Sequence, residues 1–283
     1  MDVDGDGKID ILSGSYSRLE GSMAGLFQVL RGTEAGFAKP TPLLGTDGNP
    51  LTMPSSEEDP TTSICTRPFA VDWDGDGHLD IVTGNFRGEF QWFRGTGPGK
   101  YEPKAAVIQG AKGPLSVPMH SDPFVIDWDR DGDLDLVSGA ADGSVRLFWN
   151  TGTRQAPVFE HTVLLLQSKG HGDREEVLTK APTLDRPQGS ARVWIDDVNG
   201  DGKWDLLVGD SVAYEVYAEG VDPEEGARRL AEWTAKMSKI FERFPEDGEP
   251  DKDLEAEYEA HFALRESIVK QHMYGSVWLL LGA

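Results

Sequence analysis

A nine-residue acidic segment occurs four times in the chain and constrains its fold more than any other feature. The second copy, residues 72–80, has the sequence DWDGDGHLD, in which positions 1, 3, 5 and 9 are carboxylates and position 6 is glycine. Glycine at position 6 permits the positive φ that folds such a loop back on itself. Oxygen ligands at alternate positions around this bend suit a hard cation, and Ca²⁺ in particular. We therefore predict a calcium loop at each copy.

The four copies, called loops one to four from here on, predict one set of metal ligands each. Side-chain oxygens serve at positions 1, 3, 5 and 9, whereas the residue at position 7 (Lys8, His78, Asp133 or Lys203) offers its backbone carbonyl. The predicted ligands are Asp2, Asp4, Asp6, Lys8 and Asp10 in loop one; Asp72, Asp74, Asp76, His78 and Asp80 in loop two; Asp127, Asp129, Asp131, Asp133 and Asp135 in loop three; and Asp197, Asn199, Asp201, Lys203 and Asp205 in loop four. We expect up to four bound Ca²⁺ ions.

Two alternatives to this interpretation were considered. An EF-hand loop closes with a bidentate Glu at position 12 and continues into a helix, but position 12 here is Ser13, Thr83, Ser138 or Val208, and a short apolar strand ending in glycine follows. Acidic hairpin turns without metal are the second alternative. They would have to tolerate carboxylates about 4 Å apart, whose repulsion is on the order of several kcal/mol per pair.

The spacing of the loops predicts tandem antiparallel sheets. The loops begin at residues 2, 72, 127 and 197, and the segments around the middle two correspond over their whole length: 67–73 to 122–128, 88–93 to 143–148, and 96–97 to 151–152. Each complete unit contains four predicted strands, at 66–72, 79–84, 89–94 and 101–109 in the second unit. Four-stranded sheets repeated in tandem are the blades of a β-propeller.

The repeated pattern D-x-D-x-D-G-x-x-D, followed by a hydrophobic strand ending in glycine, resembles the FG-GAP/VCBS repeat of integrin-α-like β-propellers. The resemblance covers 1–212 and resumes at 275–281. It implies an all-β propeller with Ca²⁺ bound between the first two strands of each blade for structural reasons. It also implies a setting outside the cytoplasm, in adhesion, surface or carbohydrate-related proteins.

We expect about four blades, at about 1–65, 66–120, 121–190 and 191–283, with the first and last incomplete. Blade one has predicted strands near 9–13, 26–31 and 37–44, and the strand that would precede loop one is missing, which predicts an N-terminally truncated chain. Blade four postpones its third strand to 275–281. The intervening residues 213–274 carry apolar residues at helical spacing after an Asp222-Pro223 start, which predicts an inserted α-helical hairpin. The propeller domain therefore comprises 1–212 plus 275–283.

The composition limits the classes of partner that the chain can bind. The formal net charge is −22, which argues against nucleic acid because phosphates would be repelled. The sequence contains neither a transmembrane run nor a signal peptide, so we expect no membrane insertion. The single Cys65 excludes an internal disulfide framework. We expect a secreted, periplasmic or cell-surface protein.

Strand parity predicts where recognition occurs. The calcium loops and the turns between strands three and four lie on one edge of the blades, whereas every long insertion falls on the other. We therefore expect a glycan or protein ligand opposite the calcium loops. Candidate contact residues there are Tyr16, Arg18, His120, His171, Arg174 and Arg186. Segment 222–273 could pack on the propeller or serve a partner or self-association.

The function predicted is a binding or adhesion module. A carbohydrate-active enzyme, such as a polysaccharide lyase or hydrolase on the same scaffold, is the alternative, although the sequence contains no His-Glu-x-x-His, Gly-x-Ser-x-Gly or phosphate loop. A structural repeat fragment of a larger surface protein is the third hypothesis.

Overall fold

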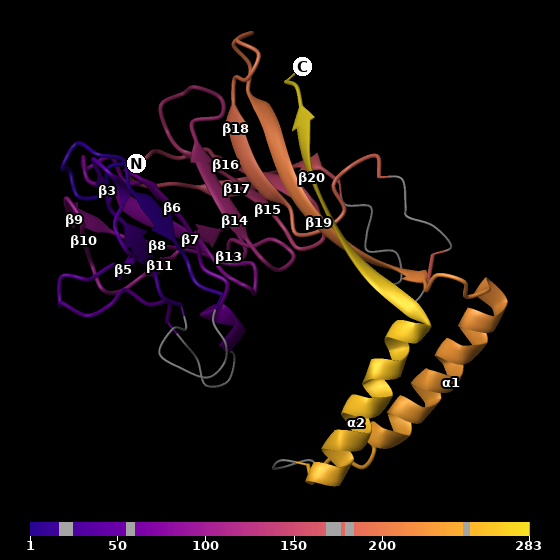
Figure 1. The fold of residues 1–283 in the computed structure, drawn as a ribbon. Coiled ribbons are helices and arrows are strands. Elements are labelled where there is room, and N and C mark those ends of the chain that lie inside the picture. The colour runs from indigo at the N-terminus through magenta and orange to yellow at the C-terminus, as the bar shows by residue number, and fades with distance from the viewer. Residues whose placement is uncertain (17–24, 55–59, 168–176, 179–183, 246–249, 283) are drawn as a thin grey trace. The chain divides into compact units, whose positions relative to one another are not determined.

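The computed structural model describes residues 1–16, 25–54, 60–167, 177–178, 184–245 and 250–282 (Figure 1). Contacts divide the chain into two units, which are described separately. Unit one comprises Met1–Gly170, Arg186–Asp210 and Ser276–Ala283, and unit two comprises His171–Asp185 and Ser211–Gly275.

Blades two and three of unit one are complete four-stranded antiparallel sheets, as the repeat predicted. Blade two consists of β6 (Arg67–Val71), β7 (Asp80–Gly84), β8 (Phe90–Phe93) and β11 (Ala106–Val107). Blade three consists of β14 (Asp122–Ile126), β15 (Asp135–Gly139), β16 (Val145–Asn150) and β17 (Phe159–Leu166). Strands one and two pair in the same register in both blades, from Arg67 opposite Gly84 and from Asp122 opposite Gly139. The two units of the sequence repeat therefore have the same local fold.

Blades one and four contain three strands each within the described residues. Blade one consists of β1 (Ile11–Ser13), β2 (Gln28–Leu30) and β5 (Thr41–Pro42). Blade four consists of β18 (Arg192–Asp196), β19 (Asp205–Tyr217) and β20 (Val269–Leu280), of which β19 after Asp210 and β20 before Ser276 belong to unit two. The third strand of blade four does follow the helical insertion, as predicted.

Short hairpins accompany these blades. They are β3 (Gly32–Thr33) with β4 (Gly36–Phe37), β9 (Gly95–Gly97) with β10 (Lys100–Tyr101), and β12 (Gln109–Gly110) with β13 (Gly113–Pro114). The 3₁₀ turn η1 covers Pro60–Thr62. The parallel bridge between Gly110 and Phe159 joins the third hairpin to blade three.

Two of the predicted fourth strands are not continuous in the structure, so these predictions were wrong. The strand predicted at 101–109 is divided into β10 and β11, and the one predicted at 37–44 is divided into β4 and β5. Proline explains both breaks, because Pro103 and Pro40 lack the N–H that a continuous ladder requires.

The core of unit one lies between consecutive blades. Ile81 packs in a cluster that blade two shares with blade one, whereas its neighbour Val82 packs in a cluster shared with blade three. The alternation of side chains along a strand produces this arrangement, since successive residues face opposite sides of the sheet. Phe124 and Ile195 belong to a third cluster, between blades three and four.

The glycine that ends strand two in blades two and three is required by the close approach of the next blade. A Cβ at Gly84 would lie 2.2 Å from the carbonyl oxygen of Ser121, and one at Gly139 would lie 2.2 Å from that of Ala191. Gly209 has no following blade in the described chain, and the nearest atom to a Cβ there is 3.8 Å away. The repeat therefore retains glycine at this position to allow two backbones to approach.

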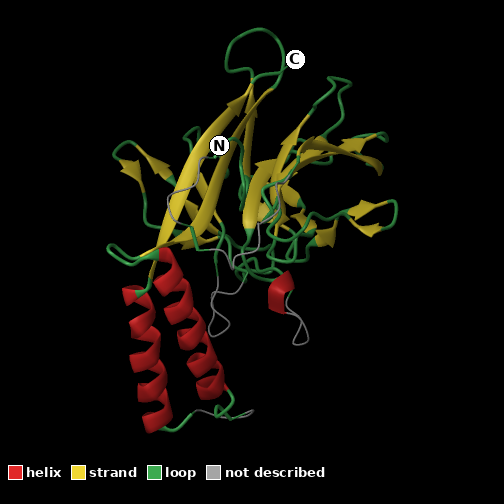
Figure 2. Cartoon of the chain, turned by 90° about the vertical axis from the view of Figure 1, so that its right-hand side faces the viewer, coloured by secondary structure: helices red, strands yellow, loops and turns green. Residues whose placement is uncertain are grey.

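Unit two contains the predicted helical hairpin, whose two helices run side by side (Figure 2). The first helix, α1 (Pro223–Phe241), begins at N-cap Asp222, and the second, α2 (Lys252–Leu264), begins at N-cap Asp251. The indole N–H of Trp233 donates to the carbonyl of His261 at 2.8 Å, and the two rings stack at 5.6 Å. His261 is therefore a packed core histidine.

The second apolar stripe does not stay helical to residue 273. After the 3₁₀ turn η2 (Arg265–Ser267), residues from Val269 onward belong to β20. The β-branched pair Ile268-Val269 favours a strand, and pairing with β19 satisfies its backbone.

Candidate metal centre

Loops one to four adopt closely similar conformations, set by aspartate side chains that accept backbone N–H groups. At position 1, the carboxylate accepts from the position-6 glycine at 2.8 Å in loop one, 3.2 Å in loop two, 3.1 Å in loop three and 2.8 Å in loop four. At position 5, the carboxylate accepts from the N–H of position 7 at 2.9 to 3.0 Å in every loop. These bonds hold one oxygen-rich bend at the start of each blade.

The predicted ligands converge in three of the loops. Ligand oxygens lie within 4.8 Å of one another in three groups: Asp2, Asp4 and Asp6; Asp72, Asp74 and Asp80; Asp127, Asp129 and Asp131. In loop four, Asp201 and Asn199 are linked directly, since the Asn199 amide donates to Asp201 at 3.2 Å. The position-7 residues Lys8, His78, Asp133 and Lys203 follow the same bend in each loop.

One further observation indicates that these residues suit a divalent cation. In loop two, Oδ1 of Asp72 is buried and has no hydrogen-bond partner among the described residues. A buried carboxylate oxygen without a donor is unfavourable, and a cation would satisfy it. In loop three, Asp133 is 8 % exposed, and its Oδ1 also lacks a partner. Burial, followed by the neighbouring Asp131, Asp129 and Asp127, raises the pKa of Asp133.

The position-9 aspartates also accept hydrogen bonds from two separate strand ends or loop residues, a role that sequence reasoning missed. Asp80 is buried, and its two carboxylate oxygens accept from the N–H of Trp73 at 2.7 Å and of Gly95 at 2.6 Å. The same pair of bonds forms at Asp10, Asp135 and Asp205. Burial is the main reason that the pKa values of Asp80 and Asp135 rise to about 6. Position 9 thus joins the loop to the end of strand three.

In blades one, two and three, a side chain at the end of strand three also contacts the acidic residues of the loop. Arg31 pairs with Asp4 in loop one, and Arg94 pairs with Asp74 at 2.9 Å and Asp76 at 3.0 Å in loop two. In loop three the corresponding residue is Trp149, whose indole N–H donates to Asp129 at 3.1 Å. The recurrence of Leu-Arg and Phe-Arg at the two strand ends was the only sequence signal for these partners.

Neighbouring blades meet at these loops, as strand parity predicts for turns that share an edge. The turn between β16 and β17 brings Arg154 onto the backbone carbonyl of Asp72 and Gln155 to within 3.1 Å of the carbonyl of Asp74. Arg154 Nη2 also lies 3.6 Å from the Asp72 carboxylate. Loop two therefore combines carboxylates from its own blade with cationic and amide groups from blades two and three.

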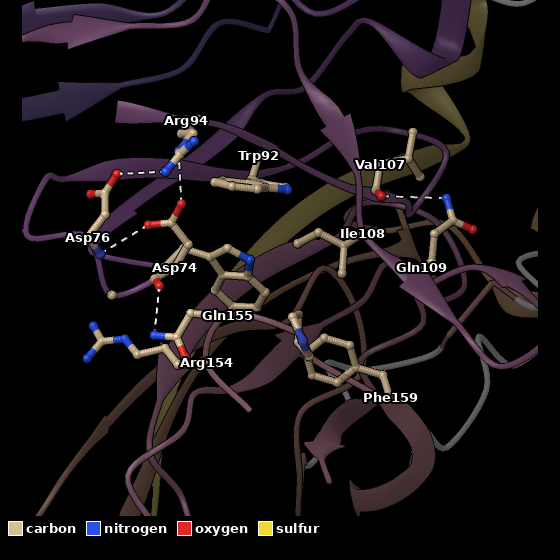
Figure 3. Close-up of a pocket in the computed structure, with 13 residues that line it drawn as sticks. Asp74, Asp76, Trp92, Arg94, Val107, Ile108, Gln109, Arg154, Gln155 and Phe159 are labelled. Atoms are coloured by element: carbon tan, nitrogen blue, oxygen red, sulfur yellow. Dashed lines mark hydrogen bonds and ion pairs between the residues drawn. The ribbon is translucent and has the colours of Figure 1, made fainter. Parts of the chain in front are cut away.

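A pocket of about 690 Å³ opens beside loop two (Figure 3). Trp92 and Arg94 lie on one side of it, and Arg154, Gln155 and Phe159 lie on the other. The pocket shares Asp74 and Asp76 with the candidate metal centre.

The predicted contact residues of the opposite edge are only partly described. Tyr16 is 72 % exposed, and His120 stacks on Phe86 with ring centroids 4.4 Å apart. Arg186 lies in the described segment that precedes β18, whereas Arg18, His171 and Arg174 lie outside the described residues.

The first residues of β6, β14 and β18, Arg67, Asp122 and Arg192, are charged. Arg67 and Arg192 flank Asp122, and Arg67 Nε and Arg192 Nη1 are buried without hydrogen-bond partners among the described residues. Burial raises the pKa of Asp122, against the lowering effect of both arginines.

Comparison with protein families agrees with this geometry. The model of the FG-GAP-like repeat matches residues 72–138 and 127–208. This chain is an FG-GAP repeat protein. The matched FG-GAP segments run from loop two into strand two of blade three, and from loop three into strand two of blade four. The mostly β, propeller-like fold is the one expected of such repeats. The curated proteins contain no match to the chain. In the described residues, no helix is both long and apolar enough to span a bilayer.

Proposed function

We propose that this FG-GAP repeat chain is a calcium-stabilised binding module of the propeller type. The recurrent carboxylate cage is the observation that carries the proposal, above all the buried and unpartnered Oδ1 of Asp72. Asp72, Asp74, Asp76 and Asp80 would hold the cation in loop two, with the carbonyl of His78. The bound Ca²⁺ would supply positive charge that offsets repulsion between neighbouring carboxylates.

Calcium in this arrangement stabilises the fold instead of taking part in a reaction. Loops two, three and four each connect strands one and two of a blade, and the position-9 aspartate reaches the end of strand three. A cation bound there therefore holds three strands of one blade together. Because extracellular calcium is plentiful, the proposal includes a secreted, periplasmic or cell-surface location.

A thermal melt in millimolar Ca²⁺ and in EDTA, with bound metal counted in parallel, tests the proposal. We expect a higher melting temperature in Ca²⁺ and close to four bound ions. Asp76→Ala and Asp131→Ala should lower the melting temperature in Ca²⁺ and change it much less in EDTA. Glu34→Ala, in an exposed turn between β3 and β4, is the matched control. Equal losses in both solutions would contradict the metal assignment for that loop.

The ligand is proposed to be a glycan or a protein. Recognition opposite the calcium loops stays a prediction that binding assays on Tyr16 and His120 variants can address. Association through 222–273 also stays a prediction. The apolar residues Phe241, Phe262 and Leu264 in this segment are 54 %, 53 % and 55 % exposed. Analytical sedimentation of variants that carry Ser at these positions would test whether the segment mediates association.

A further inference from the structure

The pocket beside loop two has an aromatic and apolar floor. Trp73, Ile108 and Phe159 line it and are each 4 % exposed, and the Trp73 and Phe159 rings stack at 6.1 Å. Trp92 forms a half-buried wall above Ile108 (Figure 3). A volume of about 690 Å³ is in the range of small-molecule sites. The pocket can therefore accept a ligand with one apolar face.

The rim of the same pocket is polar and charged. Arg94 and Arg154 contribute guanidinium groups, Gln155 contributes an amide, and Asp74 and Asp76 contribute carboxylates. Arg154 Nε is a buried donor with no hydrogen-bond partner among the described residues. A ligand that satisfies this rim must carry hydrogen-bonding groups around its edge, which excludes a purely apolar molecule.

The charge of the rim depends on the metal in loop two. The guanidinium of Arg94 bridges Asp74 and Asp76, and that of Arg154 lies near Asp72. A cation coordinated by these carboxylates adds two positive charges where the guanidinium groups now make their ion pairs. The arginines then have weaker partners in the cage and become available to an anion in the pocket.

We propose that this pocket binds a pyranose sugar carrying a carboxylate, and that Ca²⁺ in loop two is required for the binding. A pyranose has a face of C–H groups that suits the Trp92 ring and a rim of hydroxyls that suits Gln155. Its carboxylate matches the planar guanidinium of Arg94 or Arg154 in a bidentate pair. The inference rests on the proposed function, because it requires a cation in loop two.

The corresponding pocket of blade three shows why the inference is specific to loop two. It is lined by Asp129, Asp131 and Trp149, and none of its described lining residues is arginine or lysine. Trp149 replaces Arg94, and the pocket contains no counterpart of Arg154. An acidic sugar would therefore meet carboxylates without guanidinium partners there.

Calorimetric titration of the whole chain with digalacturonic acid tests the proposal, in Ca²⁺ and in EDTA. We expect binding in Ca²⁺ and at least about tenfold weaker binding in EDTA. The dimethyl ester of the same disaccharide, which lacks the charge, should bind at least about tenfold more weakly in Ca²⁺. Equal affinity for the acid and its ester, or equal affinity with and without Ca²⁺, would overturn the proposal.

Variants separate the pocket from the metal and from the fold. Arg94→Gln and Trp92→Ala should each weaken digalacturonate binding by about tenfold or more. Arg87→Gln removes the same charge from the turn at the other end of β8 and should leave binding unchanged. If Arg94→Gln and Arg87→Gln bind equally well, the pocket is not the site.

Asp72→Asn shows whether the cation acts in loop two or on the sugar in solution. The variant should lose both one bound Ca²⁺ and the sugar, even in excess Ca²⁺. Full sugar binding by this variant would overturn the requirement for a loop-two cation. If Ca²⁺ binds to the wild-type chain and digalacturonate does not, the sugar inference fails and the proposed function stands. If no Ca²⁺ binds, the proposed function fails as well.

Discussion

The carboxylate of Asp80, the first residue of β7, accepts a 2.6 Å hydrogen bond from the backbone N–H of Gly95, which follows the end of the next strand, β8. Its other oxygen accepts from the N–H of Trp73 at 2.7 Å. Asp80 is fully buried, so both N–H groups depend on it. The ninth position of the acidic loop therefore joins two strand ends and is also a predicted metal ligand.

Substitution of Asp80 should consequently destabilise the chain whether or not metal is present. Asp80→Ala leaves two buried N–H groups unpaired, which we expect to cost about 3 kcal/mol in the free energy of unfolding. The loss should appear in both Ca²⁺ and EDTA. Denaturant unfolding of Asp80→Ala and Asp76→Ala in the two solutions provides the measurement. If Asp80→Ala behaves like Asp76→Ala and loses stability only in Ca²⁺, these two hydrogen bonds are unimportant and position 9 acts through the metal alone.

Sequence reasoning predicted which acidic residues share each bend, but not the hydrogen bond of Asp80 to the end of strand three. The spacing of acidic residues is local, and it indicates which side chains share a bend. The approach of Gly95 to Asp80, or of Arg94 to Asp74, depends on how strand three ends beside the loop. Such contacts between separate strands leave little trace in a single sequence, because many residue types could occupy those positions.

The glycine that ends strand two provides a test of blade packing with an internal control. In Gly139→Ala, the new methyl would meet the carbonyl of Ala191 at 2.2 Å, so we expect a loss of about 3 kcal/mol or more. Gly209→Ala meets nothing closer than 3.8 Å and should change stability little. Urea unfolding of both variants gives the comparison. Similar stabilities for the two variants would show that consecutive blades do not approach as described.

The blades themselves were largely predictable, and the exceptions have local causes. Strands one to three follow alternating apolar residues between glycine turns, which is a strong signal in blades two and three. The fourth strands of blades one and two are short and interrupted by Pro40 and Pro103, so their pattern is weak. The long β20 begins within a segment whose apolar residues also have helical spacing. Pairing with β19 is the reason that this segment forms a strand.

Loop four should bind Ca²⁺ most weakly, because Asn199 replaces an aspartate and removes one negative charge. Asn199→Asp should tighten Ca²⁺ binding at this loop by about tenfold and should lower stability in EDTA by adding repulsion. The amide of Gly202, which donates to Asp197 at 2.8 Å, provides an NMR reporter for the titration. The amide of Gly132 reports on loop three and should titrate unchanged. A loop four that is already the tightest in the wild-type chain would contradict this charge argument.

His120 should make stability depend on pH. Burial, together with Arg192 and Arg67, lowers the pKa of His120 below its ordinary value of 6.5. Below pH 6.5 the unfolded chain therefore binds more protons at this residue than the folded chain, and the His120 contribution to stability falls as pH falls. His120→Asn removes the titrating group, and asparagine tolerates the φ of 51° found there.

The comparison must be made as a difference, because Asp80 and Asp135 titrate in the same range. Their pKa values are raised to about 6, so in EDTA their protonation favours the folded chain as pH falls. These carboxylates contribute equally to wild type and His120→Asn and cancel in the difference. We expect the wild-type melting temperature to fall relative to that of His120→Asn between pH 7 and about 5.5. A constant difference over this range would show that His120 titrates alike in the folded and unfolded chains.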